Sequence, residues 1–132
     1  MIRSATLDDM DRILEIARSA YPQFDEVGAR AWGQGAMSNP GFCVLLGEKT
    51  FGVTGISAPF YAPRNLRATM LFLASQERAG YEPCLLLRRM VSWAFDNGAQ
   101  SYRFGSDTDA NMVTFAKRLG ARLDKPSWVM GA

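Results

Sequence analysis

The sequence contains no histidine among its 132 residues. Imidazole is the usual base of Ser-His-Asp and Cys-His sites and a dominant ligand of catalytic zinc. Its absence excludes both kinds of catalytic group and argues against a zinc enzyme. The chain also has no Cys-x-x-Cys pair, and its two cysteines, Cys43 and Cys84, each lie in an apolar run. We therefore expect two buried, reduced thiols, as in a cytoplasmic protein.

Long apolar runs and a strong excess of one charge are also missing. No stretch approaches the roughly 20 apolar residues that cross a bilayer, and the N-terminus does not have the pattern of a signal peptide. Fifteen Lys and Arg against thirteen Asp and Glu give a net charge of +2, too balanced for a dedicated nucleic-acid surface. With 48% hydrophobic residues, we expect one domain over residues 1–132, with neither a membrane nor a nucleic-acid partner.

Four segments have the apolar spacing of helices. Thr6 is suited to cap the first, and Pro22 stops it. Pro83 suits the first turn of the strongest one. The helices are expected over residues 7–21, 25–37, 83–97 and 109–120.

Strands are expected over residues 1–5, 42–46, 50–57, 67–74, 101–105 and 121–130. The second and third form a hairpin. The continuous apolar character of residues 67–74 predicts a strand that is covered on both faces. Residues 67–105 read as strand, helix and strand, which is a crossover unit. The fold class is therefore α/β or α+β, with a mixed, mostly antiparallel central sheet flanked by about four helices.

Two segments resemble motifs of one family. Residues 2–9 read Ile-Arg-Ser-Ala-Thr-Leu-Asp-Asp, and residues 115–120 read Phe-Ala-Lys-Arg-Leu-Gly. With the order of elements, they resemble the first strand and the penultimate helix of the GNAT superfamily, the acetyl-coenzyme A dependent N-acetyltransferases. The resemblance covers nearly the whole chain and indicates a short, degenerate member, of the kind that phages also encode.

The resemblance implies that a glycine-rich turn before a helix binds the cofactor pyrophosphate through backbone amides. The family pattern is Arg/Gln-x-x-Gly-x-Gly/Ala, whereas residues 77–83 read Glu-Arg-Ala-Gly-Tyr-Glu-Pro. Neither of two alignments, one anchored on Arg78 and one that retains Gly80, restores the full pattern. Glu82 brings a carboxylate near the phosphates and Pro83 lacks an amide. The implied pyrophosphate site consists of Arg78, Ala79, Gly80, Tyr81 and Glu82.

Further site residues follow from the same resemblance. Backbone groups of Leu71, Phe72 and Leu73 would pair with the pantetheine arm, and Asn111 with Phe115 would flank the cofactor. The family's acidic tyrosine falls at Ala116, so the proton donor and acceptor must be sought elsewhere. Candidate bases are Asp107, Asp109 and Glu82, and candidate acids are Tyr61, Tyr81 and Tyr102; we take Asp107 and Tyr102 as the catalytic pair. Tyr61 and Arg64, in a proline-rich loop, are either substrate-binding or solvated.

The leading interpretation is transfer of an acetyl group from acetyl-CoA to an amine of a small molecule or protein, by direct attack on the thioester. A mild charge asymmetry agrees with an anionic ligand, because residues 64–125 carry ten Lys and Arg against six Asp and Glu. The eroded loop and Ala116 favour an alternative, a catalytically inactive binding or structural module, for example one associated with a virion. An unrelated α/β domain is a third possibility, and homodimerisation is left open.

Overall fold

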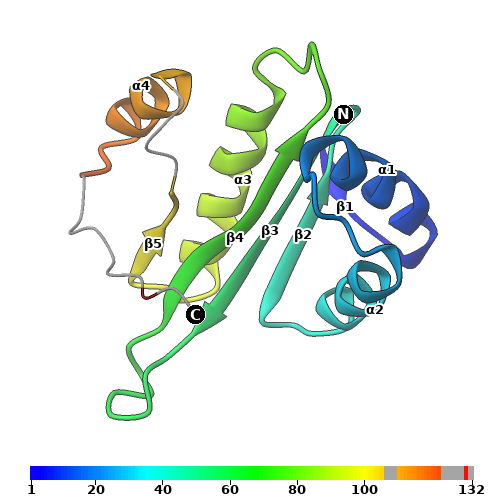
Figure 1. The fold of residues 1–132 in the computed structure, drawn as a ribbon. Helices are drawn as coiled ribbons and strands as arrows, with labels where there is room; N and C mark the ends of the chain where they lie inside the picture. The colour runs from blue at the N-terminus through cyan, green and yellow to red at the C-terminus, as the bar shows by residue number, and fades with distance from the viewer. Residues whose placement is uncertain (106–109, 123–129, 131–132) are drawn as a thin grey trace.

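A computed structural model gives the structure of residues 1–105, 110–122 and 130 (Figure 1). The elements are β1 (Arg3–Ser4), a 3₁₀ turn (Leu7–Asp9), α1 (Met10–Ala20), α2 (Glu26–Met37), β2 (Phe42–Leu46), β3 (Thr50–Ser57), β4 (Arg67–Ser75), α3 (Glu82–Asp96), β5 (Ser101–Arg103) and α4 (Ala110–Arg118). This order confirms the prediction from the first strand to the fourth helix. The strand expected over residues 121–130 falls mostly outside the described residues.

The strands form one sheet in the order β1-β2-β3-β4-β5. The first three pairings are antiparallel and the pairing of β4 with β5 is parallel. The parallel pair requires a crossover, which α3 provides. Both the mixed, mostly antiparallel sheet and its flanking helices are therefore as predicted.

Helices lie on both faces of the sheet (Figure 1), and each face has its own apolar core. On one face, α1 and α2 contribute Ile13, Ile16, Ala17 and Ala36 to a cluster that includes Val44, Phe51 and Val53. On the other face, α3 contributes Leu86, Leu87 and Met90, which pack with Cys43 and Leu45; Phe115 of α4 and Leu119, directly after α4, pack against them. The alternation of Cys43 and Val44 between these clusters is the period-two pattern of a strand covered on both sides. Among the described helices, none is long and apolar enough to cross a membrane.

The first helix is held in place by an ion pair. The Asp9 carboxylate accepts the Thr6 amide at 2.8 Å, and both of its oxygens bind the Arg3 guanidinium, at 2.5 and 2.6 Å. The Arg3 hydrogen bond, more than any other contact, holds the pKa of Asp9 well below its ordinary value. β1 and the start of α1 are thereby joined across only five intervening residues.

The prediction that both faces of β4 are covered is wrong for the middle of the strand. Leu71 and Phe72 are each 39% exposed. The reason is a β-bulge: Val53 pairs with Phe72 and Thr54 with Met70, so Leu71 has no partner on β3. A bulge bends its strand and interrupts the regular ladder, and this local irregularity is not visible in an uninterrupted apolar run.

Candidate functional site

The sheet opens between β4 and β5 at the bulge. The two strands pair only at Arg67, Ala68 and Thr69, opposite residues 101–103. Beyond Thr69, no residue in the described part of the chain pairs with the outer edge of β4, and Figure 1 shows β5 beside only the first part of the long strand. Within the described residues, main-chain donors and acceptors of residues 70–75 on this edge have no strand partner, and such groups are of the kind that pair with a ligand carrying amide groups. This is where the sequence placed Leu71, Phe72 and Leu73.

The loop that follows β4 has an unusual backbone. Arg78 has a φ of +61° and Gly80 a φ of +62°, so two residues separated by only one are left-handed. The amides of Glu77, Arg78, Gly80 and Tyr81 donate to no acceptor in residues 1–105, 110–122 and 130. The Tyr81 ring is 83% exposed and so does not fill the bend. Four unsatisfied amide donors directly before a helix N-terminus are the elements of an anion site.

The Glu82 side chain is engaged at the hairpin turn between β2 and β3. Its carboxylate accepts the Glu48 amide at 2.9 Å and the Lys49 amide at 2.7 Å. Burial raises the pKa of Glu82, but the hydrogen bonds from Lys49 and Glu48 outweigh this effect, so the net pKa is lowered and the carboxylate is charged at neutral pH. The sequence alone placed this charge beside the phosphates, whereas the structure gives it two donors of its own.

An aromatic cluster that the sequence analysis missed lies beside the bulge. The Phe72 ring meets Trp32 edge-on at 5.2 Å and Tyr21 at 6.3 Å between centroids. Trp32 in turn meets Phe42 at 5.9 Å. Tyr21 is 36% and Trp32 44% exposed, so these rings, from α2 and the end of α1, present apolar surface on the α1–α2 side of β4. Their separation in sequence left no signal from which the cluster could be found.

The predicted catalytic residues lie in different surroundings. Tyr102 is half-buried beneath α3, and its hydroxyl shares a 2.6 Å hydrogen bond with the fully buried Thr54 hydroxyl. Burial raises the pKa of Tyr102 to about 12, so the phenol is protonated at neutral pH but already has a partner in the core. Asp107 and Asp109 lie outside the described residues.

The remaining predicted residues are spread over the molecule. Asn111 lies in the first turn of α4. Phe115 packs against the α3 cluster, and the Arg88 guanidinium lies 5.9 Å from its ring centre. Tyr61, 70% exposed, and Arg64 lie in the loop that precedes β4, at the opposite end of this strand from the 76–81 loop. Loop and strand edge are thus brought together, whereas Tyr61, Arg64 and Tyr102 are not part of that site.

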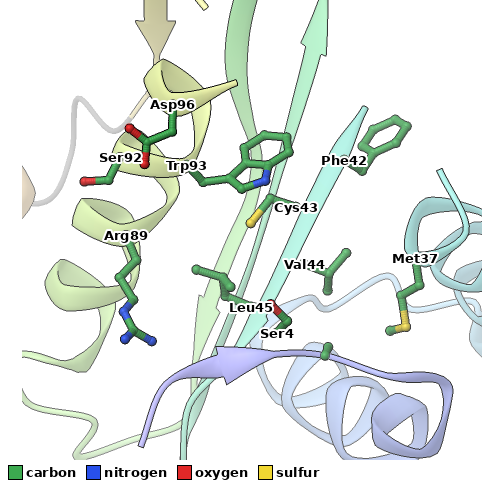
Figure 2. Close-up of a pocket in the computed structure, with 11 residues that line it drawn as sticks. Ser4, Met37, Phe42, Cys43, Val44, Leu45, Arg89, Ser92, Trp93 and Asp96 are labelled. Atoms are coloured by element: carbon green, nitrogen blue, oxygen red, sulfur yellow. The ribbon is translucent and has the colours of Figure 1, made fainter. Parts of the chain in front are cut away.

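A hollow lies at the other edge of the sheet, where β1 pairs with only two residues of β2. It measures about 480 Å³ and is lined on one side by β2, including Cys43, and on the other by α3, including Arg89, Trp93 and Asp96 (Figure 2). None of the sequence-predicted site residues lines it. The Cys43 thiol is buried as expected, whereas the prediction is wrong for Cys84, which is only partly buried. Burial raises the pKa of Cys43 to about 11, which makes it a poor nucleophile at neutral pH.

Comparison with known proteins identifies the fold. No protein-family model and no curated protein matches the chain. Among solved structures, it is similar to an aminoglycoside 6'-N-acetyltransferase of Acinetobacter haemolyticus, with a TM-score of 0.78 and 11% identity over 100% of this chain and 97% of the other. It is also similar to AAC(6')-Iy in complex with the bisubstrate analogue CoA-S-monomethyl-acetylneamine, with a TM-score of 0.80 and 9% identity over 100% and 97% of the two chains.

A third similar structure has a different description. A transcriptional regulator of Bacillus halodurans has a TM-score of 0.80 and 14% identity over 100% of this chain and 99% of its own. At such identities the likeness establishes architecture and leaves activity to be argued from the site. The chain has the fold of the GNAT superfamily of acetyltransferases.

Proposed function

We propose that the chain is an N-acetyltransferase with acetyl-coenzyme A as the donor and an amine as the acceptor. The observation that supports this most is the pairing of two features of the described residues: four amides of residues 77–81 that have no acceptor among them, and an outer edge of β4 that has no strand partner among them beyond Thr69. The amides match the anionic pyrophosphate, and the strand edge matches the amide-bearing pantetheine arm. When bound, acetyl-CoA would supply the thioester that an amine attacks directly.

The chain's own residues would have distinct tasks. The Arg78 side chain, exposed beside the free amides, would add a charge-assisted contact to the phosphates. The rings of Tyr21, Trp32 and Phe72 would bind an acceptor with an apolar or cationic group next to its amine, since aromatic faces attract cations. We retain Asp107 as the proposed base, and we assign Tyr102 to the core because Thr54 occupies its hydroxyl.

Calorimetric titration with acetyl-CoA tests the proposal. We expect micromolar affinity for the wild-type protein and at least tenfold weaker binding in Arg78→Ala, because a hydrogen bond to a charged group contributes about 1.5–3 kcal/mol. Arg30→Ala is the matched control, since Arg30 pairs with Asp11 on α1 at 2.7 Å, away from the loop. Incubation with a panel of amines, followed by mass spectrometry, would then identify the acceptor. No heat at millimolar acetyl-CoA would refute the proposal and favour the inactive module.

A further inference from the structure

The hairpin turn between β2 and β3 is bonded to both ends of the 76–81 loop. At the start of the loop, the Gln76 amide donates to the Lys49 carbonyl at 2.8 Å. At its end, the Glu82 carboxylate accepts the Glu48 and Lys49 amides. The same three-residue turn, residues 47–49, therefore fixes the points at which the loop leaves β4 and enters α3.

Two further features adapt the turn to this task. Arg12 of α1 donates through Nη2 to the Glu48 carbonyl at 2.5 Å and to Gln76 Oε1 at 2.9 Å, which ties the turn and the loop to a helix. At Gly47, an added Cβ would lie only 2.5–2.8 Å from the carboxylate atoms of Glu82. Only glycine at this position leaves room for the Glu82 carboxylate.

Between these anchors, the loop has few backbone hydrogen bonds. The Glu82 amide donates to the Ala79 carbonyl at 3.2 Å and the Leu85 amide to the Tyr81 carbonyl at 3.1 Å, while four of the loop's own amides have no acceptor in the described part of the chain. Two of its residues have positive φ. A loop held in this way from its two ends offers its amides to a ligand without having to order on binding, which is the energetic advantage of preorganisation.

We propose that Glu82 is a positioning residue whose carboxylate, seated on the Gly47–Lys49 turn, holds the 77–81 amides ready for the cofactor phosphates. This inference rests on the proposed function. The expected effect of removing the Glu82 charge on cofactor binding is opposite to the one that charge alone predicts. Removal of a carboxylate beside a polyphosphate site should strengthen binding by reducing repulsion, whereas loss of the seated carboxylate releases one end of the loop and weakens binding.

The experiment compares Glu82→Gln, Gly47→Ala and the control Gly35→Ala, whose added methyl meets no atom within 4 Å. Glutamine keeps the shape but sets an amide group against one of the two backbone donors. Gly47→Ala keeps the charge of Glu82 but places a methyl group where the Glu82 carboxylate lies. We expect both to weaken coenzyme A binding by at least tenfold in titration calorimetry, and the control to change it by less than twofold.

Three readouts separate positioning from general stability. Urea denaturation verifies that each variant is folded under the binding conditions. Hydrogen exchange should be faster at one of the Glu48 and Lys49 amides in Glu82→Gln, which keeps a single oxygen acceptor, and at both amides in Gly47→Ala, in which the carboxylate is displaced. With any amine that is turned over, KM for acetyl-CoA should rise while kcat is preserved. Should Gly47→Ala not fold, Glu82→Gln carries the same tests alone.

The outcomes discriminate between the two proposals. If wild-type protein does not bind coenzyme A, the proposed function fails. Unchanged hydrogen exchange at both the Glu48 and Lys49 amides in Glu82→Gln would show in addition that the Glu82 carboxylate does not hold the 47–49 turn. If wild-type protein binds coenzyme A but Glu82→Gln binds it equally or more tightly, the function stands and the positioning role is refuted.

Discussion

Replacement of Tyr102 by phenylalanine distinguishes a structural hydroxyl from a catalytic one. The change removes the 2.6 Å bond to Thr54, whose hydroxyl is fully buried and then keeps, among the described residues, the Met90 Sδ as its partner at 3.2 Å. A net hydrogen bond is worth about 0.5–1.5 kcal/mol, and a buried group left poorly satisfied costs more. We expect Tyr102→Phe to lower the free energy of unfolding by about 1–2 kcal/mol at pH 7, measured by urea denaturation.

The dependence of stability on pH at alkaline pH gives an independent measure of the role of the Tyr102 hydroxyl. The pKa of Tyr102 is about 12 in the folded protein, against an ordinary value of 10.0. Because the folded-state pKa is the higher one, this stabilisation is complete below pH 10 and is lost as the pH rises from 10 to 12. A difference of two pKa units between the folded and unfolded states contributes at most about 2–3 kcal/mol to the free energy of unfolding. Tyr102→Phe should therefore lose less stability than the wild type between pH 9 and 11.

Turnover provides the decisive contrast. If Tyr102 only supports the core, kcat for acetyl transfer in Tyr102→Phe should stay within about threefold of wild type when measured well below the unfolding temperature. Loss of a general acid would instead lower kcat by roughly 10²- to 10⁴-fold. A fall of that size with unchanged stability would refute the structural assignment. Tyr61→Phe, at a 70% exposed position, is the control for stability.

Three other predictions concern single groups. Arg78→Gly should be about 1 kcal/mol more stable to urea than Arg78→Ala, because only glycine adopts a φ of +61° without strain; equal stabilities would contradict this. In a Cys84→Ser background, Cys43 should react with a thiol reagent at pH 8 no faster than the protein unfolds, given its pKa of about 11, and rapid labelling of folded protein would count against its burial. Asp9→Asn should lose less stability than the wild type as the pH falls below about 4. The stabilisation that comes from a lowered carboxyl pKa is present above the ordinary pKa and disappears on acidification. If the urea midpoint falls equally in the variant and the wild type between pH 6 and pH 3, this prediction is wrong.

Sequence periodicity predicted the elements well because burial is regular along most of them. The stripe of α3 is an example, with Leu86, Leu87 and Met90 all fully buried at the spacing of one helix face. The same reasoning failed at Leu71, because a bulge depends on how two strands align, which an apolar run does not encode.

The candidate site was only partly accessible from the sequence, for a similar reason. The loop before α3 could be located from the resemblance and from the position of Pro83. The direction of the Glu82 side chain could not, because its partners lie more than 30 residues earlier in the chain. The Tyr21, Trp32 and Phe72 cluster likewise depends on contacts between α1, α2 and β4 that no local pattern records.

The extra residue in β4 is unnecessary for the core. Met70 and Leu73 pack on the α3 side, while Phe72 meets Trp32 on the opposite side. Leu71 lies near Gly55 and Phe42 on that same side. Deletion of Leu71 would therefore leave a strictly alternating strand with every buried side chain on its present face. The inserted residue therefore adds a partly exposed side chain to one face without changing which face the others occupy, and the shortened strand would show directly whether the insertion parts β4 from β5.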